Sequence, residues 1–418
     1  MKNSAITTLN LVGLTVLISA AGCSDLAVEG NDFPADYSES GNNYGNNGAD
    51  SGADYDQGER SPETDDTRDD VQQPTEPNWT DTSEDNLATF SIDVDTASYT
   101  YARRSISTGA LPTPERVRVE EFINFFQYDY EGPDELAREP FAIHLESGPS
   151  PFGENKHLLK VGIKGKEVPA QERPATNLVF LVDVSGSMLS EDKLPLVKRS
   201  LTTLLTALRP QDTLGLVVYA GRDAILLEPT RVEERGAIYE AIESLRAGGS
   251  TNGAGGLRTA YELAQSAFVE GGINRVVLCT DGDFNVGVTG EALVDLVVSW
   301  NDRDIALTVL GYGRNFNDSF LEDLTNRANG NYAFIDSYNE ALRVLGEQLI
   351  STLQIIAKDV KIQVELDPST VARYRVVGYI NRAIADDDFR DDTVDAGEIG
   401  SGHNVTAFLE IELHDSAQ

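Results

Sequence analysis

The central part of the chain alternates short apolar runs with segments of helical period, and this alternation limits the fold more than any other feature. Four apolar runs have the length and composition of buried strands, at residues 178–182, 214–219, 276–280 and 305–310. Strands that are apolar on both faces are typical of a parallel sheet covered by helices on both sides. The alternation therefore predicts an α/β domain with a doubly wound, mostly parallel sheet.

Helices are predicted between these runs. One apolar stripe marks a helix after the first run, with Pro195 in its first turn, where proline is tolerated. The stripe consists of Leu194, Val197, Leu201, Leu204, Leu205 and Leu208. Further helices are predicted at residues 232–245, 257–268, 291–300 and 338–356. In a fold of this kind, ligands bind at the carboxyl ends of the strands.

Oxygen-bearing side chains stand where such a ligand would bind. Asp183, Ser185 and Ser187 follow the first run, Asp281 follows the third, and Thr251 precedes a helix in a Gly-Gly-Ser-Thr-Asn segment. All five side chains are hard oxygen donors, which Mg²⁺ prefers in octahedral coordination. Taken alone, the Asp-x-Ser-x-Ser pattern also suits a helix-capping turn. Within the Ser250-Thr251 pair, either hydroxyl could coordinate.

The Asp183-x-Ser185-x-Ser187 segment, Thr251 and Asp281 occur in this order at the strand ends and before the helix, and together they resemble the metal-ion-dependent adhesion site of von Willebrand factor type A domains. The resemblance covers about residues 176–357. It implies that the hydroxyls of Ser185, Ser187 and Thr251 bind a divalent cation, and that Asp183 and Asp281 contribute carboxylates directly or through water. Mg²⁺ is the first expectation, with Mn²⁺ and Ca²⁺ as alternatives. The implied role is adhesion or protein interaction, in which an acidic side chain of a protein partner becomes the sixth ligand.

The flanks, at residues 87–175 and 358–418, are expected to be β-rich. Strand-like patterns occur at residues 141–145, 157–163, 360–366 and 405–413, and a helix is predicted near 114–126. Within these flanks, residues 90–128 and 387–407, including Asp395-Ala-Gly-Glu-Ile-Gly-Ser-Gly-His403, resemble those of a bacterial lipoprotein group that carries the same central domain. In that group the carboxyl segment is usually longer, so the last domain is expected to be incomplete. Neither flank alone provides a sheet with two good faces. We therefore expect them to pair into one sandwich into which the central domain is inserted.

Residues 1–23 resemble the signal sequence of a bacterial lipoprotein. A single cation at Lys2 precedes an apolar run at residues 5–21, as in secretory signals. The run ends in Ala20-Ala21-Gly22-Cys23, which is similar to a lipobox and implies that Cys23 is lipidated. The protein is then expected to be anchored in the cell envelope, at the outer membrane or cell surface rather than the inner membrane. An ordinary signal peptide is the alternative, and the run is short for a membrane span of ~20 residues.

Residues 24–86 form an acidic segment that is expected to be a disordered linker. It holds 18 Asp or Glu and 2 Arg residues, which gives a net charge of −16 out of −36 for the whole chain. Such a composition buries too little apolar surface to offset the entropy of ordering. The same charge excludes DNA and RNA as partners, because their phosphates would be repelled.

The two cysteines have separate interpretations. Cys279 lies within an apolar strand run and is predicted to be a small buried hydrophobic residue without chemistry. With Cys23 assigned to lipid, no disulfide is expected.

The alternative function is that of a metal-dependent phosphohydrolase using Asp93 and Asp95. These residues resemble the opening motif of hydrolases with an aspartate nucleophile, but Ala97 stands where that motif has Thr or Val. A Gly-x-Ser-x-Gly nucleophile elbow and a phosphate-binding Gly-Lys-Ser/Thr loop are both absent from the sequence. The sequence therefore predicts a binding protein without catalytic residues.

Overall fold

The computed structural model describes most of the chain from residue 78 onward and two short segments near its start. The described residues are 4–11, 14–21, 78–92, 95–134, 137–169, 171–249, 253–282, 291–301, 303–313, 321, 324–325, 330–348, 354–379, 384–390 and 396–415. Cys23, Asp93, Thr251 and nearly all of the predicted linker lie outside them. Among the helices of the described segments, none is long and apolar enough to cross a membrane.

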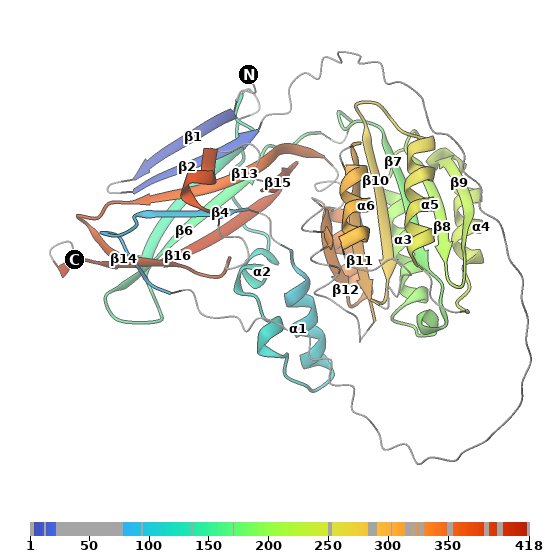
Figure 1. Ribbon diagram of the computed structural model, residues 1–418, viewed down its shortest axis with the longest axis horizontal. Coiled ribbons are helices and arrows are strands. Elements are labelled where there is room, and N and C mark those ends of the chain that lie inside the picture. Colours follow the sequence, from blue (N-terminus) through green and yellow to red (C-terminus); the bar gives the residue numbers. More distant parts are fainter. Residues whose placement is uncertain are drawn as a thin grey trace, which may run out of the picture. The chain divides into compact units, whose positions relative to one another are not determined.

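The central domain is built on a six-stranded sheet in the order β12-β11-β10-β7-β8-β9 (Figure 1). All neighbours are parallel except β8 and β9. The strands are β7 (Thr176–Asp183), β8 (Thr213–Tyr219), β9 (Asp223–Arg231), β10 (Ile273–Thr280), β11 (Ile305–Tyr312) and β12 (Asn331–Ile335). The predicted doubly wound, mostly parallel sheet is confirmed.

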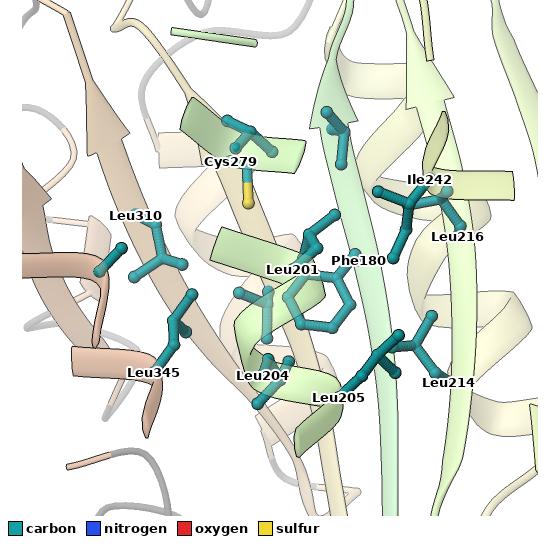
Figure 2. Packing of buried hydrophobic residues seen from close by; sticks show 14 of the residues in the cluster. Phe180, Leu201, Leu204, Leu205, Leu214, Leu216, Ile242, Cys279, Leu310 and Leu345 are labelled. Atoms are coloured by element: carbon teal, nitrogen blue, oxygen red, sulfur yellow. The ribbon is translucent and has the colours of Figure 1, made fainter. Parts of the chain in front are cut away.

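Two apolar layers, one on each face, cover β7. All eight residues of this strand are buried, and because side chains alternate in direction along a strand, they divide between two cores. Phe180 packs with α3 (Leu194–Ala207) and α4 (Arg235–Ser244) in one cluster, together with Cys279 and Leu310 (Figure 2). Val179 and Leu181 belong to the cluster on the opposite face, with residues of α5 (Gly253–Ser266) and α6 (Glu291–Asn301).

The helices of the central domain occupy the predicted places with one exception. They are α3 (Leu194–Ala207), α4 (Arg235–Ser244), α5 (Gly253–Ser266), α6 (Glu291–Asn301) and α8 (Tyr338–Ala341). The helix predicted at residues 338–356 was wrong in its extent, because α8 passes into a π-helix at Leu342–Gln348 and a strand begins at Ile355. Apolar residues that support a helix equally support the start of a buried strand.

The two flanks share one core between two sheets. One sheet joins β4 (Leu87–Ser91), β13 (Ile355–Leu366) and β15 (Gly397–Gly400), and the other has the order β3-β14-β16-β6-β5. The second sheet consists of β3 (Thr80–Asp81), β14 (Val371–Val376), β16 (Asn404–Leu413), β6 (Lys156–Gly165) and β5 (Phe141–Pro149). Buried residues of both sheets, such as Phe90, Val161 and Ile362, form a single cluster. The prediction that the flanks pair into one sandwich is confirmed.

Two further strands lie in the predicted signal segment. β1 (Ser4–Leu11) and β2 (Leu14–Ala21) form a hairpin, and β2 pairs antiparallel with β13 from Lys358 to Leu366. This pairing describes the uncleaved chain. The removal of residues 1–22 during export stays a prediction.

Helix α1 (Ala97–Ser107), which was not expected from the sequence, connects the amino-terminal flank to the central domain. Its Arg103 guanidinium donates to both carboxylate oxygens of Asp336, at 2.9 and 2.5 Å. The neighbouring Arg104 contacts the Asp192 carboxylate at 2.5 Å. The predicted helix near residues 114–126 is present as a 3₁₀ turn at Pro114–Arg116 followed by α2 (Val119–Asn124).

A buried ion pair joins the start of β7 to the loop before β8. The Arg173 guanidinium lies 2.5 Å from the Asp212 carboxylate, and both side chains are at most 2% exposed. Asp212 also accepts a hydrogen bond from the Thr176 backbone N at 3.0 Å. Removing one partner of such a pair leaves the other charge buried without compensation.

We expect Asp212→Ala to lower the free energy of unfolding by about 3–5 kcal/mol. The matched control is Glu243→Ala, which breaks the Lys198–Glu243 pair, in which the Glu243 side chain is 71% exposed, and should cost less than about 1 kcal/mol. Urea unfolding followed by circular dichroism measures both. Equal losses in the two variants would contradict the structural role of the buried pair.

Candidate metal centre

Two acidic residues meet at the carboxyl edge of the central sheet. β7 ends at Asp183, and β10 ends one residue before Asp281. The two strands are parallel neighbours, with Val182 aligned to Cys279. The strand order runs outward from this pair in both directions, so the two carboxylates stand at the switch point where ligands bind in doubly wound sheets.

The first loop gathers three predicted oxygen donors. The Asp183 side chain is fully buried, and its Oδ1 accepts a hydrogen bond from the Ser185 backbone N at 2.7 Å. The Oγ atoms of Ser185 and Ser187 are 2.9 Å apart. A 3₁₀ helix at Gly186–Leu189 turns the chain after Ser185. Asp183, Ser185 and Ser187 are therefore brought together as the sequence predicted.

A second loop, which contains Gly248 and Gly249, is hydrogen-bonded to the first loop. The Gly248 backbone N donates to the Val184 carbonyl at 2.7 Å, and the Gly186 backbone N donates to the Gly249 carbonyl at 3.1 Å. Gly249 has a φ of +96°, a left-handed conformation that glycine adopts without strain. This pairing brings the chain to the first loop two residues before Thr251. Because Thr251 itself lies outside the described residues, its place among the ligands stays a prediction.

Asp281 has a cationic partner that the sequence did not indicate. The Asp281 side chain is 1% exposed, and its Oδ2 lies 2.7 Å from the Lys193 Nζ. The same ammonium donates to the Ser187 carbonyl at 3.1 Å. Lys193 stands at the N-cap of α3, ten residues after Asp183, and no motif marked it. Its role follows only from the folded positions of three separate segments.

Burial makes the negative charge of Asp183 costly. Desolvation raises the pKa of this carboxyl above its usual range, hydrogen bonds from Ser185 oppose the rise, and the charge of Asp281 adds to it. The Asp183 Oδ2 atom is buried, and no hydrogen bond of normal geometry reaches it from the residues that the structure describes. Desolvation, followed by the charge of Asp183, raises the pKa of Tyr219 well above its usual value. A cation bound at this point would offset the cost.

The donor set fits a hard divalent cation that binds hydroxyls as well as carboxylates. Across the described ranges, no three His, Cys, Asp or Glu side chains gather as a metal site. The cluster offers two carboxylates and two serine hydroxyls instead. Oxygen-only donors suit Mg²⁺ and Ca²⁺ better than Zn²⁺, which prefers nitrogen and sulfur ligands.

The residues of the hydrolase alternative lie elsewhere. Asp95 Oδ1 accepts a hydrogen bond from the Tyr332 backbone N at 3.3 Å, which attaches the segment before α1 to β12. Asp93 is outside the described residues. Two histidines of the flanks, His144 and His414, contact the backbone carbonyls of Glu131 and Pro368.

The buried Cys279 beneath the site is predicted to be unreactive. It is a free cysteine and fully buried, and desolvation raises its pKa to about 12. Because the thiolate is the reactive species, iodoacetamide at pH 8 should leave Cys279 unmodified in the native protein and modify it after unfolding. Peptide mass spectrometry reports this site separately from Cys23. Rapid native labelling of Cys279 would contradict the burial.

Three family models match different parts of the chain. A model described as von Willebrand factor type A domain matches residues 177–348. One described as von Willebrand factor matches residues 65–160, and one described as Uncharacterized protein YfbK, C-terminal, matches residues 351–418. The predicted arrangement of a central domain between two distinct flanks agrees with these matches.

Two relatives match this chain over part of their length. The chain is 43% identical over 335 residues to Uncharacterized protein YfbK of Escherichia coli (strain K12), which is 78% of this chain and 58% of that protein. It is 29% identical over 188 residues to Uncharacterized protein sll0103 of Synechocystis sp. (strain ATCC 27184 / PCC 6803 / Kazusa), covering 45% of this chain and 44% of that protein. The chain thus spans about half the length of these two relatives.

Among solved structures, a von Willebrand factor type A protein from Catenulispora acidiphila is 16% identical, with a TM-score of 0.43. The match covers 69% of this chain and 67% of that one.

Proposed function

We propose that the protein binds a divalent cation and uses it to hold an acidic side chain of a partner protein, on the basis of the match of residues 177–348 to the von Willebrand factor type A domain model. Domains of this family typically mediate adhesion or protein interaction. The observation that carries the metal proposal is the convergence of the buried Asp183 carboxylate with the hydroxyls of Ser185 and Ser187, beside Asp281.

The proposed site uses residues from three loops. Ser185 and Ser187 would contribute hydroxyls and Asp183 and Asp281 carboxylates, directly or through water, while Thr251 is the proposed fifth donor. Mg²⁺ is the proposed ion, with Mn²⁺ or Ca²⁺ as alternatives of similar chemistry. When bound, the ion supplies a centre of positive charge that attracts a carboxylate. No catalytic residue is assigned.

The loops around the proposed site hold its oxygen donors in place and keep the carboxylates buried. Hydrogen bonds between the two glycine-containing loops fix the backbone around the hydroxyls, so the donors need little rearrangement when an ion enters. The surrounding burial of Asp183 and Asp281 lowers the local dielectric response and strengthens the attraction for a cation.

We expect Asp183→Asn to remove the effect of Mg²⁺ on stability without unfolding the protein. An ion at a hundredfold excess over its Kd stabilises the native state by about 2.7 kcal/mol, which raises Tm by roughly 5–10 °C for a domain of this size. Because the substitution also removes a costly buried charge, the variant should melt no lower than wild type in EDTA. Differential scanning calorimetry with EDTA and with Mg²⁺ measures both effects.

Asp93→Ala is the control and should retain the full Mg²⁺ shift. The hydrolase alternative makes the opposite demand, because hydrolysis of a phosphate ester would then depend on Asp93 and persist in Asp183→Asn. An equal Mg²⁺ shift in wild type and Asp183→Asn would remove the basis of the proposal.

A lipid anchor at Cys23 is proposed as the means of holding this binding domain at the cell envelope. The support is the sequence alone: an apolar signal-like run that ends in a lipobox-like tetrapeptide. The acidic segment that follows would then act as a tether between the membrane and the folded part.

Labelling of cells with a palmitate analogue tests the anchor. Wild-type protein should become labelled and partition into the membrane fraction, and Cys23→Ser should do neither. The matched variant Cys279→Ser, which changes the other cysteine, should label like wild type. Equal labelling of wild type and Cys23→Ser would refute the anchor.

A further inference from the structure

The Lys193 ammonium is part of the candidate metal centre without being one of its oxygen donors. Its Nζ lies 2.7 Å from Asp281 Oδ2 and 3.1 Å from the Ser187 carbonyl. It therefore links the loop after β7 to Asp281, the residue that follows β10. The side chain is only 17% exposed, so solvent screens its charge less than that of a surface lysine.

The fold makes room for this side chain. Gly313, directly after β11, has a φ of +94°, and a Cβ atom at this position would collide with the Lys193 Cε and crowd Cδ and Cγ. The lysine stem therefore crosses the backbone where there is no side chain. At the preceding residue, the Asp192 carboxylate lies 2.5 Å from the guanidinium of Arg104 of α1. The ammonium is positioned by packing and by its neighbours.

The charges of this cluster determine what a bound ion would attract. Among the described residues, the charged side chains of the cluster are Asp183, Asp281 and Lys193, while the buried Tyr219 hydroxyl, whose pKa is raised, stays neutral. Metal binding requires both carboxylates to be ionised, so these three groups carry a net charge of −1. A divalent cation then makes the loaded site positive by one charge, whereas without the lysine it would be neutral.

We propose that Lys193 sets the ligand selectivity of the metal centre, by keeping the loaded site net positive so that it captures a carboxylate. This inference rests on the proposed metal-binding function. In this proposal the charge of Lys193 has two opposite effects on binding. The ammonium weakens the binding of the metal by repulsion, and it strengthens the binding of an anionic ligand to the loaded metal.

Neutral substitutions at Lys193 separate these two effects. Lys193→Met removes the charge and keeps most of the apolar stem, and Lys193→Gln removes the charge and keeps a donor for the Ser187 carbonyl. The control is Lys198→Met in the same helix, which removes one positive charge from the surface pair with Glu243. The purified full chain in detergent is titrated with Mn²⁺, and the Mn²⁺-loaded protein is then titrated with acetate, both followed by water proton relaxation.

Both neutral variants should bind Mn²⁺ about three- to tenfold more tightly than wild type, since one nearby, partly screened positive charge is lost. The affinity of the loaded protein for acetate should fall by a similar factor. Lys198→Met should match wild type in both titrations.

Three results would overturn the inference. Unchanged Mn²⁺ and acetate affinities in the Lys193 variants would show that its charge does not act on the site. Weaker Mn²⁺ binding in both variants would show that Lys193 holds Asp281 in place for the metal and does not oppose binding. A wild-type protein that binds no Mn²⁺ would overturn the proposed function itself, and the inference with it.

Discussion

The parallel pairing of β7 with β10 is the constraint on which the rest of the structure depends. Both strands are buried on both faces, and their apolar side chains fill two helix-covered cores, while Asp183 and Asp281 lie at or just beyond their carboxyl ends. From this pair the sheet continues to β8 on one side and to β11 on the other, so the carboxyl ends of β7 and β10 form the switch point at which ligands bind in doubly wound sheets. Asp183 and Asp281 stand side by side for this reason, although they are far apart in sequence. The interior also isolates them from water, which is the origin of the raised pKa of Asp183.

Elements with a long, continuous apolar pattern could be predicted from the sequence, and short or half-exposed elements could not. The four central strands are continuous apolar runs, and all of them appear at the predicted places. β9 and β12 were not predicted, because β9 is half exposed, with Ile225 at 44% and Leu226 at 39% exposed, and β12 spans only Asn331–Ile335. The helix expected to reach residue 356 ends earlier, since local periodicity does not report where the chain leaves one domain and enters β13 of the other.

The residues of the candidate site also differ in whether the sequence could predict them. The convergence of Asp183, Ser185, Ser187 and Asp281 could be predicted because all four lie at the end of a recognisable strand or within a few residues after it, and strand ends meet at one edge of a parallel sheet. Lys193 could not, because its position depends on the start of α3, on the missing side chain of Gly313 and on the exact place of Asp281. A lysine near a helix start is ordinary in sequence. Its significance comes from tertiary contacts, which leave no local pattern.

The insertion of the central domain into the sandwich has a consequence for how the protein folds. β6 ends at Gly165 and β13 begins at Ile355, so the strands that share the sandwich core are separated by the whole central domain. Closing so long a loop between unstructured ends is entropically costly, and contacts of this separation form slowly. Once the central domain has formed its own core, its compactness shortens the effective distance between the two flanks. We therefore expect the inserted central domain to fold first and the sandwich that encloses it to form last.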